Sequence, residues 1–181
     1  MMDLFVKGGP LMWPILLCSI LAMAIALKKA WEFWSIWKAV SEDVETVWRK
    51  RLPYLEPIRM AVESGRNEKE IGIVGTRQIR EMEKGLGVLS LIAVISPLMG
   101  LTGTVTGMIQ AFQVIAASQT QVNPGMLAGG IWEALITTAA GLFVAIPTHI
   151  AGHFLEERLD QITLIVREAA SAAYYRRQHG N

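Results

Sequence analysis

Hydrophobic and charged positions are sharply segregated along this chain. Residues 11–27 and 85–121 carry no charged side chain, and residues 122–154 carry one acid, Glu133, and two histidines. The shortest of these stretches rises about 26 Å as an α-helix, near the lower limit for crossing a bilayer, and the other two are longer. The pattern predicts three transmembrane helices.

The segment between the first two apolar stretches is predicted to be helical as well. Apolar side chains recur at steps of three and four from Phe33 to Trp48, which indicates an amphipathic helix that ends at the prolines near residue 57. Packing against other cytoplasmic helices of the same protein is the preferred explanation of this face. Binding to a membrane surface or to a partner is the alternative.

Two further helices are predicted before the second span. The first closes at Gly65, and the second begins after Asn67 as its N-cap. Apolar positions continue from Ile71 to Leu89, so we expect one unbroken stalk that runs into the membrane. The third span is predicted to continue as a C-terminal helix with an apolar side over residues 155–169.

The placement of the basic residues predicts the orientation in the membrane, although the net charge is only +1. Of the 17 Lys and Arg residues, one precedes the first span, 12 lie between residues 28 and 84, and four lie between residues 158 and 177. By the positive-inside rule the N-terminus faces outside and the C-terminus faces the cytoplasm. This charge order also favours a retained first helix over a cleaved signal peptide.

These observations predict an all-α membrane protein with long helical cytoplasmic extensions. The expected organisation is an outside N-terminus (1–10), transmembrane helix 1 (11–30), a cytoplasmic helical region (31–84), transmembrane helix 2 (85–118), an outside loop (119–125), transmembrane helix 3 (126–154) and a cytoplasmic C-terminal helix (155–181).

Spans two and three are unusually rich in small and hydroxyl-bearing residues. Pro97 removes a backbone hydrogen bond and leaves a carbonyl for a Ser or Thr to satisfy. Small residues let helices approach closely in lipid, and they form stripes on both spans. The predicted packing and kink positions are Pro97, Gly100, Gly103, Gly107, Gly141 and Pro147.

Titratable and nucleophilic groups are scarce in the apolar stretches. Glu133 lies about two turns inside the outer end of span three. A carboxylate there is either functional, or it is solvated or hydrogen-bonded for structural reasons. His149 and His153, followed by Glu156 or Glu157, are a candidate metal site, but interfacial histidines without metal are the preferred interpretation. Cys18 is expected to be a small hydrophobe. We predict no enzymatic activity, cofactor, metal or nucleic-acid partner.

Two segments carry a family resemblance: SPLMGLTGTVTGMIQAF, and PGMLAGGIWEALITTAAGLFVAIP after it. Their motif elements resemble, in order, the signature of the ExbB/TolQ/MotA family of proton-channel subunits, and most closely its ExbB/TolQ branch. The similarity covers residues 95–154. Three spans and an outside N-terminus also suit this branch.

The resemblance implies a function and partners. Family members form rings, typically pentamers, in the bacterial inner membrane. Spans two and three line a pore around the single helices of an ExbD/TolR-like dimer, whose Asp titrates. By this resemblance Thr104 and Thr138 face that Asp, and Glu133 lies near the outer mouth. The alternative for both threonines is a hydroxyl that bonds back to a carbonyl of its own helix.

The process that the motor would drive is either TonB-type outer-membrane transport or Tol-type envelope maintenance. A TonB- or TolA-like protein would be a further partner in each case, and membrane lipid would surround the ring. The alternatives are a stator for gliding or another form of motility, and a passive membrane scaffold.

Overall fold

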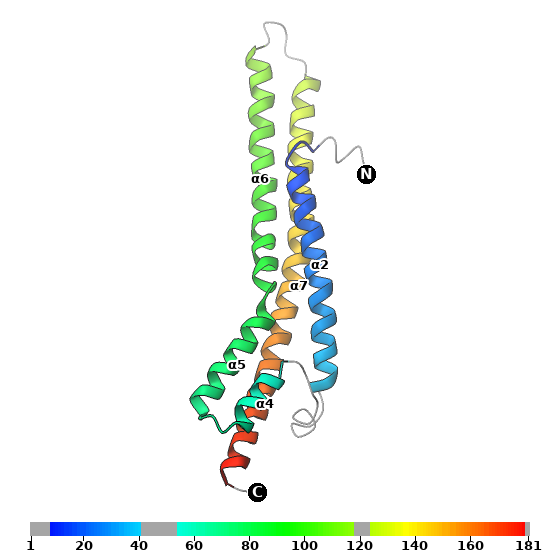
Figure 1. Ribbon diagram of the computed structural model, residues 1–181. Helices are drawn as coiled ribbons and strands as arrows, with labels where there is room; N and C mark the ends of the chain where they lie inside the picture. The colour runs from blue at the N-terminus through cyan, green and yellow to red at the C-terminus, as the bar shows by residue number, and fades with distance from the viewer. Residues whose placement is uncertain (1–7, 41–53, 118–123, 180–181) are drawn as a thin grey trace. The chain divides into compact units, whose positions relative to one another are not determined.

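The computed structural model describes residues 8–40, 54–117 and 124–179, and every regular element among them is an α-helix (Figure 1). The predicted all-helical fold class is therefore confirmed. The helices are α2 (Met12–Val40), α4 (Glu56–Glu63), α5 (Glu68–Glu83), α6 (Leu86–Ala117) and α7 (Pro124–His179).

Three of these helices are long and apolar enough to cross a membrane, in agreement with the predicted number of spans. The segments that meet the criterion are Met12–Lys38, Leu86–Ala116 and Ala128–His179. α6 and α7 remain helical through Pro97 and Pro147. α7 already begins at Pro124, a residue that suits the first turn of a helix because its missing N–H has no partner there.

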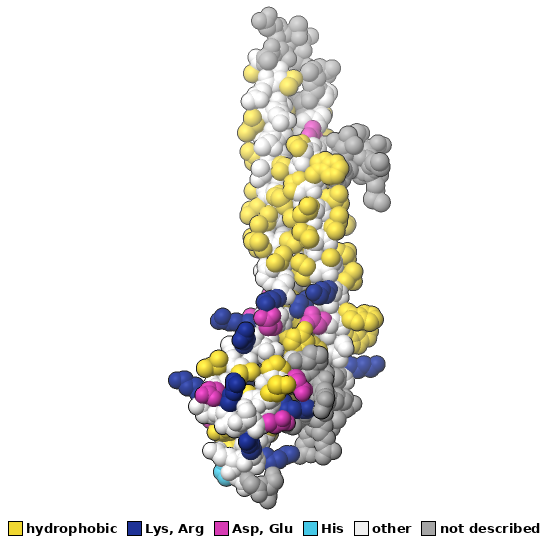
Figure 2. All heavy atoms as spheres, in the orientation of Figure 1, with side chains coloured by type: hydrophobic (Ala, Val, Ile, Leu, Met, Phe, Trp, Pro, Cys, Tyr) yellow, Lys and Arg dark blue, Asp and Glu magenta, His cyan; other side chains and the backbone are white. Residues whose placement is uncertain are grey.

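Contacts divide the chain into two compact units. The first comprises residues 1–26 and 88–152, and thus the start of α2, most of α6 and the first half of α7. Its interior is built from small and aliphatic side chains, whereas large apolar side chains point outward, including Phe143, which is 84% exposed. Figure 2 shows such side chains gathered over this unit. An apolar exterior suits contact with lipid or with other apolar helices.

The second unit comprises residues 27–87 and 153–181, and its core joins four helices. Phe33 of α2, Ile58 of α4, Met82 of α5 and Ile162 of α7 are all buried. Arg158 adds a cation–π contact with Trp37, 4.6 Å from the ring centroid. Lys, Arg, Asp and Glu side chains are numerous over α4 and α5 (Figure 2).

Several predicted elements of this unit are confirmed. α4 is followed by Gly65, whose N–H donates to the Val62 carbonyl. Asn67 caps α5, because its side chain accepts a hydrogen bond from the Glu70 N–H at 2.8 Å. The C-terminal extension of span three is also helical, and it buries Leu155, Leu159, Ile162 and Ala169. The predicted amphipathic helix from Phe33 runs as part of α2 to Val40, and its remainder lies outside the described residues.

The prediction of an unbroken stalk from Ile71 to Leu89 is wrong. α5 ends at Glu83 and α6 begins at Leu86, with Gly85 between them at φ 98°. That left-handed conformation suits glycine, which has no Cβ to clash with its own backbone, and it ends the helix. Apolar residues continue at helical spacing on both sides of Gly85, so the sequence pattern did not indicate the break.

A buried lysine stabilises the end of α5. Lys29 is only 6% exposed, and its Nζ donates to the Met82 carbonyl at 2.9 Å. The last carbonyls of a helix lack partners within the helix, and a cation there also interacts favourably with the helix dipole. The charge of Lys29 is balanced by Glu32, 2.9 Å away. The Tyr54 hydroxyl in turn donates to Glu32, and this bond, with partial burial, raises the pKa of Tyr54 to about 12.

Candidate functional site

α6 and α7 approach each other through glycines within the first unit. A Cβ added at Gly141 would lie 2.5 Å from the Ser96 carbonyl oxygen and 3.3 Å from the Gly100 Cα. A Cβ added at Gly100 would lie 2.9 Å from the Thr138 Cα. These neighbours are backbone atoms that cannot rotate away, so the two helices pack this closely only because both positions lack a side chain.

The same close contact continues toward the start of α7. Gly103 of α6 faces Thr137, and Gly107 faces Ala134, whose Cβ would lie 3.1 Å from an added Cβ. We call the whole line of contact the α6–α7 seam. The four glycines predicted as packing positions, Gly100, Gly103, Gly107 and Gly141, all lie on it.

Two threonines singled out from the sequence lie at or next to this seam. The Thr138 hydroxyl donates to the Gly100 carbonyl at 2.8 Å and so links α7 to α6. The Thr104 hydroxyl donates to the Leu101 carbonyl of its own helix at 2.7 Å, one turn from Gly100. Both side chains are half-buried. Each hydroxyl oxygen keeps acceptor capacity after it donates its proton, so each can still accept a hydrogen bond.

The other two threonines of α6 lie on an exposed part of the helix. Thr102 donates to the Leu98 carbonyl at 2.8 Å, and Thr106 donates to the Thr102 carbonyl at 2.9 Å. They are four residues apart and share a face, from which the intervening Thr104 points away. Thr102 and Thr106 therefore match Thr104 in chemistry but not in position.

Pro97 does not receive the compensation expected from the sequence. Proline lacks an N–H, so the carbonyl of Ala93 loses its helical donor. No hydroxyl among the described residues donates to that carbonyl, and the nearby Ser96 hydroxyl is fully buried without a hydrogen-bond partner in the described part of the chain. Ser96 is thus a buried polar residue at the point where Gly141 of α7 packs against its backbone carbonyl.

The turn before α2 packs against α7 at Glu133. Gly9 has φ 71°, and a Cβ added there would lie 2.5 Å from the Glu133 Oε1. One helical turn further along, the Thr137 hydroxyl lies 2.9 Å from the Gly8 carbonyl and 3.0 Å from the Glu133 carbonyl. Glu133 is consequently half-buried beside the N-terminal turn.

Thr137 is the residue whose role the sequence did not reveal. It is 2% exposed, and it fills the space between Gly103 and the turn at Gly8. The available signal was its place among the small residues of α7, four residues after Glu133. Its partner lies 129 positions earlier in the chain, so helical spacing could not indicate the contact.

The predicted candidate metal ligands of α7 lie on the surface of the helix. His149 and His153 are both exposed. Among the described residues, no three His, Cys, Asp or Glu side chains are grouped so that they could hold a metal ion.

The fold and the seam define a multi-pass helical membrane protein whose apolar helices meet through glycine and carry half-buried hydroxyls. A model of the MotA/TolQ/ExbB proton channel family matches residues 46–168. The chain belongs to this family, as the two sequence segments indicated.

Individual relatives are similar over different lengths of chain. The putative biopolymer transport protein ExbB-like 1 of Synechocystis is 32% identical over 81% of this chain and 66% of its own length. The biopolymer transport protein exbB1 of Vibrio cholerae is 46% identical over 47% of this chain and 37% of its own length. The Tol-Pal system protein TolQ of Haemophilus influenzae is 38% identical over 52% of this chain and 41% of its own length. The chain thus spans less than two thirds of the length of each of these relatives.

Proposed function

We propose that this chain is the ring subunit of a proton-driven motor in the bacterial inner membrane, which works with a single-span partner of the ExbD/TolR type. Membership of a proton channel family supports the proton as the ion that drives the motor. The relatives' names, which refer to biopolymer transport and to the Tol-Pal system, support work on the cell envelope, either TonB-type transport or Tol-type maintenance.

The observation that carries this proposal is the mismatch between hydroxyls and titratable groups at the α6–α7 seam. Thr104 and Thr138 offer polar oxygens within apolar helices. The titratable groups of the same apolar stretches lie elsewhere: Glu133 packs against the N-terminal turn at Gly9, and His149 and His153 are exposed further along α7. A proton relay needs a group that binds and releases a proton. We assign this role to the partner's transmembrane Asp, because neither threonine is hydrogen-bonded to a titratable side chain of the described residues.

The two threonines would recognise both states of that Asp. With their protons on the Leu101 and Gly100 carbonyls, the hydroxyl oxygens accept a hydrogen bond from a protonated carboxyl. Rotation of either hydroxyl breaks its backbone bond and offers the proton to an ionised carboxylate instead, which forms a stronger, charge-assisted hydrogen bond. The protonation state of the partner thereby selects the hydroxyl orientation.

The energy available to such a cycle comes from the membrane potential. Each proton that crosses gains about 2.3 kcal/mol per 100 mV. Alternate protonation and release of the Asp against successive subunits of a homo-oligomer, as in a pentamer, would turn the central helices within the ring. The proposed topology has an outside N-terminus, a cytoplasmic C-terminus and Glu133 near the outer mouth, where its exposed part attracts cations.

The decisive variant removes both seam hydroxyls without changing side-chain shape. Thr104→Val with Thr138→Val, in the complex with its co-purified partner, should lower potential-driven proton uptake into proteoliposomes by about tenfold or more, since a loss of about 1.4 kcal/mol at the rate-limiting step corresponds to a factor of ten. The matched control is Thr102→Val with Thr106→Val, which removes two hydroxyls from the same region of α6 and should leave uptake intact. Equal uptake by the two double variants would show that Thr104 and Thr138 do not serve the ion pathway.

A further inference from the structure

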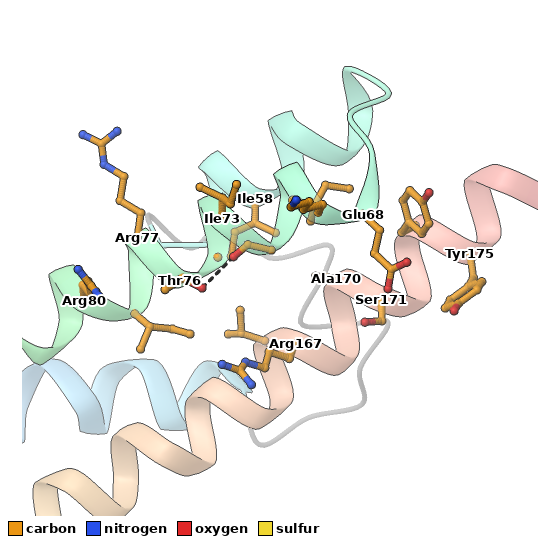
Figure 3. Close-up of a pocket in the computed structure, with 17 residues that line it drawn as sticks. Ile58, Glu68, Ile73, Thr76, Arg77, Arg80, Arg167, Ala170, Ser171 and Tyr175 are labelled. Atoms are coloured by element: carbon orange, nitrogen blue, oxygen red, sulfur yellow. Dashed lines mark hydrogen bonds between the residues drawn. The ribbon is translucent and has the colours of Figure 1, made fainter.

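The second unit contains an open groove between α5 and the last part of α7 (Figure 3). It holds about 700 Å³, and its surface is mostly apolar, with Ile73 and Ile79 on one side and Val166 and Ala170 on the other. Ile73, one of the residues that line the groove, is 63% exposed. A large apolar side chain left open beside a groove marks a surface that another molecule can cover.

Most of the charged side chains that line the groove are cationic: Lys69, Arg77, Arg80 and Arg167, against one acid, Glu68. Arg77 and Arg80 lie on α5 and Arg167 lies on α7, and the Arg77 side chain extends away from α7 (Figure 3). All three are exposed, and none forms a salt bridge within the part of the chain that the structure describes. The groove therefore combines an apolar floor with three exposed guanidinium groups, of which Arg77 also interacts electrostatically with Glu81.

A complementary surface lies on α7 of the same chain. Glu157, Asp160, Leu164 and Glu168 follow one another at steps of three and four and so share a face of the helix. All four are exposed, and Leu164, at 60%, is an apolar side chain among three acids. We call these four residues the acidic ridge. None of its carboxylates is in a salt bridge with another described residue.

We propose that the groove binds the acidic ridge of a second copy of this chain. Leu164 would enter the apolar floor, and the carboxylates would pair with Arg77, Arg80 and Arg167. The ridge cannot enter its own groove, because the ridge and the α7 wall of the groove belong to one continuous helix. This inference rests on the proposed ring, and it names a contact that holds neighbouring subunits together.

The contact has a consequence for assembly. Groove and ridge are different surfaces, so each copy keeps a free groove on one side and a free ridge on the other after pairing. Such a head-to-tail interface repeats from copy to copy and closes into a ring where the rotation permits.

A photo-cross-linking amino acid tests the contact in the otherwise unaltered complex. We expect p-benzoyl-phenylalanine in place of Leu164 to give, on irradiation of native membranes, a series of covalent multimers whose cross-linked peptides come from α5. The control probe replaces Met60 of α4, which is equally exposed at 61%, and it should give no cross-link to α5 peptides of a second copy.

Charge reversal adds a second readout. Arg77→Glu with Arg80→Glu should reduce the multimers by about tenfold, because like charges across an interface are strongly unfavourable. Adding Glu157→Lys and Glu168→Lys to the same chain should restore them. Circular dichroism checks that each variant keeps its helical content.

The outcomes separate this inference from the proposed function. If native mass spectrometry finds a ring but the Leu164 probe reacts with lipid, with another protein or with nothing, the groove does not bind the ridge and the ring remains. If native mass spectrometry finds only single copies, the proposed ring is wrong, and the contact inferred from it is wrong too.

Discussion

Replacement of Gly141 by alanine tests whether the α6–α7 seam depends on glycine. The new Cβ would lie 2.5 Å from the Ser96 carbonyl oxygen, whereas ordinary contact begins at 3.4 Å, so the helices must separate by about 0.9 Å at this point. A gap of about 0.5–1 Å already forfeits between a quarter and a half of the dispersion attraction of each atom pair it opens. The Thr138–Gly100 hydrogen bond lies next to this point and would lengthen as well.

The loss of stability caused by Gly141→Ala is best judged against the same change at a second glycine of α7. Gly129 has no atom within 4 Å of an added Cβ. Glycine to alanine improves helix propensity by about 1 kcal/mol at either position, so this contribution cancels between the two variants. Overpacking costs about 1–3 kcal/mol, and we expect Gly141→Ala to be less stable than Gly129→Ala by that amount.

Thermal unfolding in detergent, followed by tryptophan fluorescence, measures the difference. For a chain of this size each kcal/mol lowers Tm by about 2–4 °C. Equal Tm values for Gly141→Ala and Gly129→Ala would refute the close approach of the two helices at Ser96.

Three further predictions concern the second unit. Lys29→Met leaves the Met82 carbonyl and Glu32 without their cation, which should cost about 2 kcal/mol and speed hydrogen exchange in the last turn of α5, whereas the exposed neighbour Lys28→Met should change neither. The Tyr54–Glu32 hydrogen bond raises the pKa of Tyr54 from 10.0 to about 12. The contribution of this bond to stability is therefore complete below pH 10 and is lost as the pH rises from 10 to about 12. Tyr54→Phe should show a smaller loss of stability over the same pH range. Asn67→Ala should cost about 1 kcal/mol and increase amide exchange in the first turn of α5, and Asn67→Asp should not.

The sequence predicted the helices well because charge decides where a chain can cross a membrane. Long uncharged stretches have no alternative to helix in lipid, since every backbone polar group must be satisfied internally. The cap at Asn67 was also predictable, because that signal is contained within four residues. The close contacts at Gly100 and Gly141 follow from the same logic, as small residues mark where helices approach.

The features that escaped prediction depend on backbone geometry or on distant partners. The break at Gly85 was hidden because apolar spacing continues on both sides, and only its φ of 98° reveals it. Thr137 meets a carbonyl 129 residues away, and Lys29 caps a helix 53 residues away. Neither partner can be inferred from spacing along one helix.

Proton flux with and without the partner tests the central claim most directly. The claim is that this chain supplies the wall of the ion pathway and its partner supplies the titrating carboxyl. Proteoliposomes that contain this chain alone should show no potential-driven proton uptake, the complex with its co-purified single-span partner should take up protons, and the change of the partner's transmembrane Asp to Asn should abolish uptake. Proton uptake by this chain alone, or uptake that survives the Asp to Asn change, would contradict the account.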